Sequence, residues 1–325
     1  MLMRKRTQEI LLAVILGVFV PIVAFGLAEK LVERRPEKEM PHQEQVPTGI
    51  PSQTGREIAV QLSEGNIRMM ELEEYITGVV LAEMPASFES EALKAQAVVA
   101  RTYALKRVLE EGKHPSNAVC TDPACCQAYV TEEQCLQMNG QQYDKVCDAV
   151  LQTEGLVLVY EGDLIEATYF SCSGGRTEDA VAVWGGKIPY LVSVESPGEQ
   201  HAEHYVDTVF LDKAVFCEQL DLTTDAVTEH GIGEITSTAG GGVDTIQIGG
   251  ETFTGVQVRQ LLGLRSTAFR ITIAGTTVTI TTKGYGHRVG MSQYGADAMA
   301  VAGHDYRDIL AHYYPGTCLQ EWLDN

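Results

Sequence analysis

Basic residues are scarce in this chain of 325 residues, because 24 lysines and arginines face 44 aspartates and glutamates. Residues 1–56 hold eight basic and six acidic side chains, a net charge of +2, so residues 57–325 hold sixteen and thirty-eight, a net charge of −22. Binding to nucleic-acid phosphates requires a surplus of positive charge. We therefore expect no nucleic acid among the partners of this protein.

The sequence also lacks low-complexity tracts, an internal repeat and the regular βαβ alternation of parallel α/β folds. With 45% hydrophobic residues it can build a sizeable core, in one large domain or two ordinary ones. The apolar periodicities predict an α+β body of helices and mainly antiparallel strands with a substrate groove. Strands are expected at 57–62, 67–70, 156–160, 164–171, 235–237, 245–248, 269–274 and 277–282, and helices at 72–84, 90–109, 256–262, 292–302 and 305–313.

The N-terminus has the pattern of a membrane segment. Three basic residues, at positions 4–6, precede an uncharged stretch from Ile10 to Ala28, whose nineteen residues would span about 28 Å as a helix. We therefore predict a cytoplasmic tail and transmembrane helix over 1–28. A cleaved signal peptide is the alternative, since small residues at 24–28 resemble a cleavage site. Basic residues on both sides leave the orientation open.

Four prolines punctuate the polar segment that follows, which predicts a semi-extended linker over 29–56. The folded domain is expected at 57–325.

Four motifs in the body carry a family resemblance. They are LEEYITGVVLAEMP at 72–85 followed by EALKAQAVVARTY at 91–103, then ATYFSCSGGRTE at 167–178, IPYL at 188–191 and GYGHRVGMSQYGA at 284–296. In this order, and over nearly all of 57–316, they resemble the SpoIID family (stage II sporulation protein D). The chain departs from the family pattern at Arg288, where Gly is usual, and at Tyr294, where Trp is usual.

The resemblance implies a membrane-anchored lytic transglycosylase of peptidoglycan that acts in engulfment of the forespore. It implies a single-pass protein of the cell membrane, with the catalytic domain outside the cytoplasm of the engulfing mother cell. Related domains occur in proteins described as amidase enhancers. A non-catalytic activator of a cell-wall amidase is therefore the alternative function, and an amidase is an expected partner besides the glycan strands.

The resemblance also assigns a catalytic acid, because the Glu of the family's Ala-Glu-Met-Pro motif corresponds to Glu83. Glu83 lies at the predicted C-terminus of a helix, where the helix dipole should raise its pKa, as a general acid requires. A lytic transglycosylase needs no second carboxylate, because the 6-hydroxyl of N-acetylmuramic acid attacks its own anomeric carbon. A hydrolase would need one, for which Glu178 or Asp179 would be the candidates.

Six further polar side chains are candidates for a sugar-binding groove, through hydrogen bonds or stacking. For each of them alone, a purely structural role is the competing interpretation. They are Lys94, Arg101, Tyr169, Ser171, Ser173 and His287.

A group of metal-ligating residues lies within thirteen positions: His114, Cys120, Cys125 and Cys126. Three thiolates and one imidazole suit tetrahedral zinc, and a filled shell implies a structural role. Some clostridial family members resemble this segment, with zinc held by two His and two Cys, and Cys125 would replace one of those His.

Disulfides are the alternative, as expected for an exported domain with eight cysteines, although a bridge between neighbouring cysteines is strained. His201 and His204 form a weaker metal candidate. A catalytic zinc hydrolase would need an open coordination position, which the cysteine group does not offer.

Overall fold

The computed structural model describes residues 55–63, 65–110 and 113–322. The predicted transmembrane helix and most of the predicted linker lie outside these residues. Within the described part of the chain, no helix is both long enough and apolar enough to cross a membrane.

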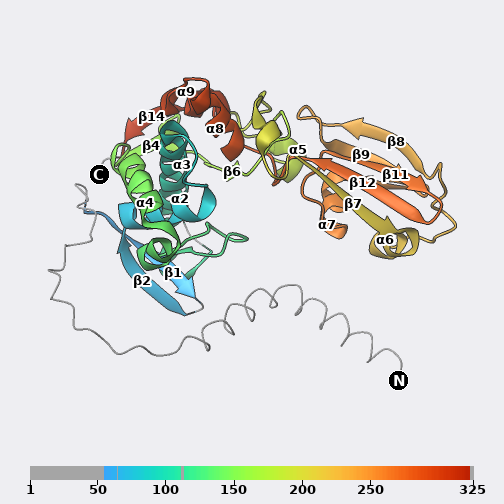
Figure 1. Cartoon of the computed structure of the whole chain (residues 1–325), viewed down its shortest axis with the longest axis horizontal. Coiled ribbons are helices and arrows are strands. Elements are labelled where there is room, and N and C mark those ends of the chain that lie inside the picture. Colours follow the sequence, from blue (N-terminus) through green and yellow to red (C-terminus); the bar gives the residue numbers. More distant parts are fainter. Residues whose placement is uncertain (1–54, 64, 111–112, 323–325) are drawn as a thin grey trace, which may run out of the picture. The chain divides into compact units, whose positions relative to one another are not determined.

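The described residues form a mixed α+β structure whose strand pairs are mainly antiparallel (Figure 1). In chain order the elements are β1 (Glu57–Ser63), β2 (Asn66–Glu71), α2 (Leu72–Glu83), α3 (Ser90–Leu109), η2 (Pro115–Asn117), β3 (Val119–Cys120), α4 (Glu132–Leu151), β4 (Leu156–Tyr160), β5 (Asp163–Leu164), β6 (Tyr169–Phe170), α5 (Ala180–Trp184), η3 (Glu199–His201), β7 (Val206–Asp212), α6 (Lys213–Gln219), β8 (Ile232–Ser237), β9 (Val243–Ile248), β10 (Glu251–Thr254), α7 (Gly255–Leu261), β11 (Phe269–Ala274), β12 (Thr277–Lys283), β13 (Met291–Ser292), α8 (Gln293–Val301), α9 (Tyr306–Tyr313) and β14 (Cys318–Glu321).

A first hydrophobic core lies around α3, which packs against α2, α4, α8 and α9. The small side chains of Ala92, Ala95, Ala97 and Ala100 are completely buried, and they let the neighbouring helices approach closely. Figure 1 shows α2, α3 and α4 side by side. The predicted helices over 72–84 and 90–109 are confirmed.

A second hydrophobic core is built from the chain between β7 and β12. It lies between two three-stranded sheets, β11-β12-β7 and β10-β9-β8, with α6 and α7 packed against them. Helix α7 begins with a capping box, in which the Thr254 side chain accepts from the backbone of Gln257 and Gln257 bonds back. The predicted helix and strands of this region are confirmed.

Two sequence predictions for the middle of the chain were wrong or incomplete. The expected strand over 164–171 is interrupted: β5 ends at Leu164, and β6 pairs in parallel with β13 instead of continuing the hairpin with β4. Helix α4 was missed, because its cysteines and polar residues hide the apolar face. A capping box between Thr131 and Gln134 marks where it begins.

Candidate functional site

A cavity of about 560 Å³ brings together segments that lie far apart in the sequence. The end of α2, one face of α3, β6, the loop after β12 and the start of α8 all contribute side chains. Five of the predicted site residues line it: the proposed acid Glu83, the groove candidates Tyr169, Ser171 and His287, and the metal-ligand candidate Cys126. The other lining residues are Tyr103, Arg107, Pro123, Thr168, Phe170, Tyr285, Gly286 and Gln293.

Glu83 is the last residue of α2, which ends because Met84 is extended and Pro85 follows. Its Oε1 accepts a hydrogen bond from the backbone N–H of Ala128, at 2.8 Å. Burial raises the pKa of the Glu83 carboxyl, and this outweighs the hydrogen bonds from Ala128, Tyr169 and Gln293, which lower it. The pKa shift has the direction predicted from the sequence, but its largest cause is desolvation.

Glu83 lines a second cavity as well. This cavity, of about 490 Å³, is lined by the end of α2, the turn from Met84 to Ala86, and residues that flank or belong to α4. Glu83 is therefore a lining residue of both cavities.

Tyr169 is fixed beside Glu83 by a chain of buried amide and phenol groups. The Gln127 side chain donates to the Tyr169 hydroxyl at 3.2 Å, and Tyr75 donates to Gln127 at 3.3 Å. Burial and the nearby Glu83 raise the pKa of Tyr169 well above its ordinary value. The phenol therefore stays neutral and can donate a hydrogen bond to the carboxyl.

His287 is an uncharged cavity residue. Its Nδ1 accepts from the backbone of Val289 at 3.1 Å, and the ring also bonds the backbone of Tyr169. Burial and the charge of Arg259 lower the pKa of His287 to about 4. With its nitrogens bound to the backbone, His287 offers the cavity a ring face instead of a proton donor or acceptor.

Three predicted groove residues do not line the cavity, namely Arg101, Lys94 and Ser173. Arg101 is completely buried, and its guanidinium forms two hydrogen bonds to the Glu73 carboxylate, at 2.8 and 2.6 Å. This ion pair ties α3 to α2. Lys94 pairs with Glu91 of its own helix at 2.6 Å.

Ser173 is buried too, because it belongs to a network around Glu199. The Glu199 carboxylate accepts from the Ser173 hydroxyl and from the backbone N–H groups of Ser173 and Gly174. Its other oxygen accepts from Ser196 and Ser292. Glu199, which the sequence did not single out, therefore holds the loop after β6 against the start of α8.

Sequence reasoning missed several lining residues. Tyr103 and Arg107 lie four residues apart on the same face of α3. Because Tyr103 belongs to a quoted motif, helical spacing could have pointed to Arg107 one turn further along the helix. Arg107 pairs with Glu166 at 2.5 Å. Gln293 was inside the quoted closing motif, but the motif does not say which of its side chains face the cavity.

Among the described residues, one group of potential metal ligands converges, and it is the predicted one. The donor atoms of His114, Cys120, Cys125 and Cys126 all lie within 4.8 Å of one another. The His114 Nε2 is 3.3 Å from the Cys125 sulfur and 3.6 Å from the Cys126 sulfur. His201 and His204 belong to no such group.

The backbone explains how adjacent cysteines reach one point. The carbonyl of Asp122 accepts from the N–H groups of both Cys125 and Cys126, which closes a tight turn after β3. All eight cysteines have free thiols in the structure. Burial and the neighbouring thiols raise the pKa of Cys126 to about 12, so a bound cation would be needed to hold this sulfur as a thiolate at neutral pH.

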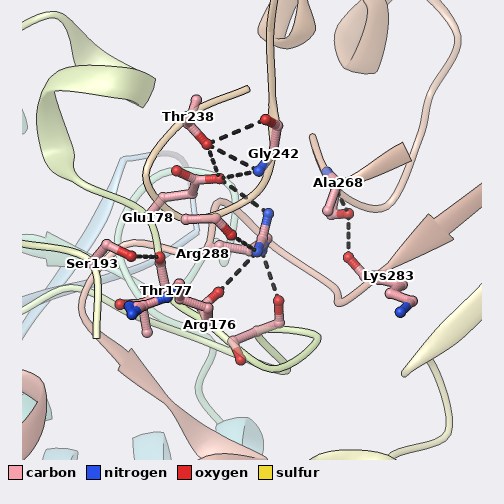
Figure 2. Close-up of polar contacts among 12 residues, drawn as sticks. Arg176, Thr177, Glu178, Ser193, Thr238, Gly242, Ala268, Lys283 and Arg288 are labelled. Carbon is pink, nitrogen blue, oxygen red and sulfur yellow. Dashed lines mark hydrogen bonds and ion pairs between the residues drawn. The ribbon is translucent and has the colours of Figure 1, made fainter. Parts of the chain in front are cut away.

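Arg288 lies at the centre of a buried polar cluster (Figure 2). Its φ of +67° lies in the left-handed region, which favours the Gly that is usual in the family pattern. The side chain offsets this unfavourable backbone conformation through hydrogen bonds. Its guanidinium donates to the carbonyls of Ser173, Arg176 and Gly240 and to the Glu178 carboxylate. Arg288 therefore links the loop after β6 to the turn between β8 and β9.

Glu178 and Asp179, the candidates for a second catalytic carboxylate, have structural contacts. Glu178 is completely buried, and it accepts from Thr238 and from the backbone of Gly242 as well as from Arg288. Asp179 accepts from the backbone of Ser193 at 2.9 Å. Neither lines the cavity that holds Glu83.

Comparison with known proteins gives consistent matches. Residues 61–160 match the family model SpoIID, stage II sporulation protein. The chain is 40% identical to stage II sporulation protein D of Bacillus subtilis (strain 168) over 263 residues, which are 79% of this chain and 76% of that protein. It is also 40% identical to the protein of that name from Bacillus amyloliquefaciens, over 80% of this chain and 77% of the relative. An amidase enhancer of Bacillus subtilis (strain 168) is 30% identical over 76% of this chain and 40% of its own length.

Proposed function

Since this chain belongs to the SpoIID family of sporulation proteins, we propose that it cleaves peptidoglycan glycan strands as a lytic transglycosylase during engulfment. The observation that carries the proposal is the environment of Glu83. Among the described residues that line the cavity, Glu83 is the single carboxyl, and burial raises its pKa. A protonated carboxyl in a cavity is what glycosidic bond cleavage requires.

Glu83 acts twice in the reaction, first as an acid and then as a base. Glu83 donates its proton to the glycosidic oxygen, and the bond between that oxygen and the anomeric carbon of N-acetylmuramic acid breaks. The 6-hydroxyl of the same sugar then bonds to the anomeric carbon and gives its proton to the Glu83 carboxylate. The products are a shortened strand and a 1,6-anhydro-N-acetylmuramic end, and Glu83 is protonated again.

Intramolecular attack fits the surroundings of Glu83. It removes the need for a second carboxylate to activate water, and the two candidates for that role are held in structural contacts. Tyr169 and Ala128 hold the carboxyl in place. The strand lies on both sides of Glu83 in this proposal, with one sugar in each cavity, and is one already stripped of its stem peptides.

The four-residue cluster is proposed to hold a structural zinc ion. Three sulfurs and one imidazole nitrogen within 4.8 Å of one another fit the size and ligand preference of a tetrahedral zinc site. All four ligands come from the protein, so the ion would stabilise the turn from Cys120 to Cys126. Zinc supplies no chemistry to the cleavage in this proposal.

The N-terminal segment is proposed to anchor the protein in the cell membrane, with the body outside the cytoplasm. The uncharged stretch over 10–28 and the linker that follows it support this placement. Peptidoglycan, the proposed substrate, lies on that side of the membrane.

A second candidate function has one observation in its favour. The relative named amidase enhancer covers 76% of this chain, which supports a non-catalytic activator of a cell-wall amidase. Such a protein would use the cavity for binding and would not need the proton of Glu83.

Mass spectrometry of products from purified, peptide-free glycan strands distinguishes the two functions. The full chain should release fragments with 1,6-anhydro ends. The Glu83→Gln variant keeps the shape but has no transferable proton, so its rate should fall at least about a hundredfold. Glu74→Gln, which changes an exposed glutamate of the same helix, should leave the rate unchanged.

Two results would contradict the proposal. Reducing ends that carry a solvent oxygen would show hydrolysis. A Glu83→Gln variant with half the parent rate would place the acid elsewhere. An inactive parent chain that accelerates an added amidase would support the activator function.

A further inference from the structure

An exposed tryptophan adjoins the cavity, and the proposed reaction leaves it without a role. Trp184, the last residue of α5, is 47% exposed, and Val181, one turn earlier on the same helix, is 51% exposed. Large apolar side chains that gather at the surface mark interaction sites, including the grooves that bind ligands. Trp184 is therefore a candidate contact residue for a ligand.

The ring of Trp184 is held in a fixed position by cavity residues. Its centroid lies 5.4 Å from that of His287, which in turn lies 5.6 Å from that of the buried Phe170. Both of these supporting residues line the cavity with Glu83. The aromatic row consequently leads from the interior of the cavity to an exposed indole.

Nothing on the next two residues covers the indole. Gly185 ends α5 in the left-handed conformation with φ +77°, and Gly186 follows. A Cβ placed on either glycine would have no atom within 4 Å. The chain next to Trp184 is therefore open to a flat ligand.

The chemistry of the row suits a sugar ring. His287 is uncharged near neutral pH, because its pKa is lowered to about 4, and the other two rings carry no charge. An aromatic face is electron-rich and attracts the weakly positive C–H groups of a sugar ring. Because the row continues from the cavity that holds the proposed acid, the sugar that reaches it belongs to the same strand.

We propose that Trp184, supported by His287, is a stacking subsite for an N-acetylated sugar ring of the glycan strand, beyond the sugars at Glu83. This inference rests on the proposed function for the identity of the strand. Trp184 acts in binding and takes no part in bond cleavage. Its support by other rings makes it a preformed platform, which reduces the entropy lost when the strand binds.

Tryptophan fluorescence tests the subsite directly, because the chain has only two tryptophans. In the full chain with Glu83→Gln and Trp322→Phe, emission comes from Trp184 alone and no strand is cleaved. Titration with chitin hexasaccharide, and separately with peptide-free glycan, should change the intensity and wavelength of this emission in a saturable way. The chain with Glu83→Gln and Trp184→Phe, which keeps only Trp322, is the control and should show no such change.

Substitution tests the energetic contribution. Trp184→Ala should weaken binding to both saccharides by about two- to tenfold, the range expected for one aromatic stacking contact, and should raise the KM of the active chain with little change in kcat. Trp184→Phe should restore part of the affinity. Val181→Ala, on the same exposed helix, should bind like the parent. The exposure of Trp184 predicts unchanged melting temperatures for all three.

The outcomes separate this inference from the proposed function. Anhydro products together with a flat Trp184 emission and an unchanged affinity of Trp184→Ala would overturn the subsite and leave the function intact. A saturable Trp184 response in a chain that releases no anhydro ends would support the subsite and overturn the function. Equal losses for Trp184→Ala and Val181→Ala would show a general apolar surface and would overturn the stacking role.

Discussion

Replacing Arg288 by glycine tests whether a side-chain network outweighs a strained backbone. Arg288 has a φ of +67°, a conformation that costs an L-residue about 1–2 kcal/mol and glycine nothing. Its guanidinium, however, is 97% buried and lies 3.1 Å from the equally buried carboxylate of Glu178. Removing one partner of a buried ion pair typically costs about 3–5 kcal/mol, because the other charge stays buried.

The two effects act in opposite directions, and the loss of the pair is larger. We therefore expect Arg288→Gly to lower the free energy of unfolding by about 1–4 kcal/mol. The variant also leaves the carbonyls of Ser173, Arg176 and Gly240 without their guanidinium donor. The loss occurs although glycine is the usual residue of the family pattern at this position.

A double-variant cycle assigns the cause. Urea unfolding of the full chain, followed by circular dichroism, gives the free energies of the parent, Arg288→Gly, Glu178→Gln and the double variant. If the buried charge of Glu178 causes the loss, adding Glu178→Gln to Arg288→Gly should recover at least about 1 kcal/mol. An Arg288→Gly variant as stable as the parent would refute this reasoning and show that backbone strain dominates.

Two further predictions concern the metal cluster and the acid. Elemental analysis of the full chain should find close to one zinc per molecule. Cys120→Ser should lower both the zinc content and the melting temperature. A metal-free chain with Cys120, Cys125 or Cys126 in a disulfide would contradict the zinc proposal. The cleavage rate should fall as the pH rises through the raised pKa of Glu83, because only the protonated carboxyl acts as acid. By the same pKa shift, the protonated carboxyl favours the folded state, and this stabilisation is lost as the pH rises through the folded-state pKa. Glu83→Gln should therefore melt at a higher temperature than the parent at neutral pH but not below pH 4; the opposite order at neutral pH would show that Glu83 folds as a stabilised carboxylate.

The sequence predicted those parts of the fold whose signals are local. Helix α2 ends where Pro85 forbids its continuation, and α7 begins after Thr254, a residue type that is common at N-caps. Helix α4 was missed because the cysteines and polar residues between Glu132 and Leu151 hide its apolar face. The strand breaks after Leu164 because β6 pairs with β13, which lies more than 120 residues further along the chain. The local alternation of polar and apolar residues cannot predict that pairing.

The candidate site shows the same limit. Glu83 of the motif lines a cavity, but the motif could not distinguish residues that face the cavity from residues that support it. Arg101 and Ser173 are polar members of the motifs, yet they are bound to Glu73 and Glu199, which lie 28 and 26 residues away. Only the folded chain shows that these partners exist. Trp184 was overlooked because it lies between two quoted motifs.

The number of residues in the turn after β3 determines where the Glu83 carboxyl is held. Cys126 belongs to the group of potential metal ligands, Gln127 bonds Tyr169, and the N–H of Ala128 bonds Glu83. One inserted residue between Cys126 and Ala128 would add up to about 3.5 Å of chain, more than the length of the hydrogen bond that holds the carboxyl. Insertions and deletions should therefore be excluded from this segment in relatives that keep both the cluster and Glu83. Substitutions at Ala128 other than proline keep the backbone N–H that bonds the carboxyl.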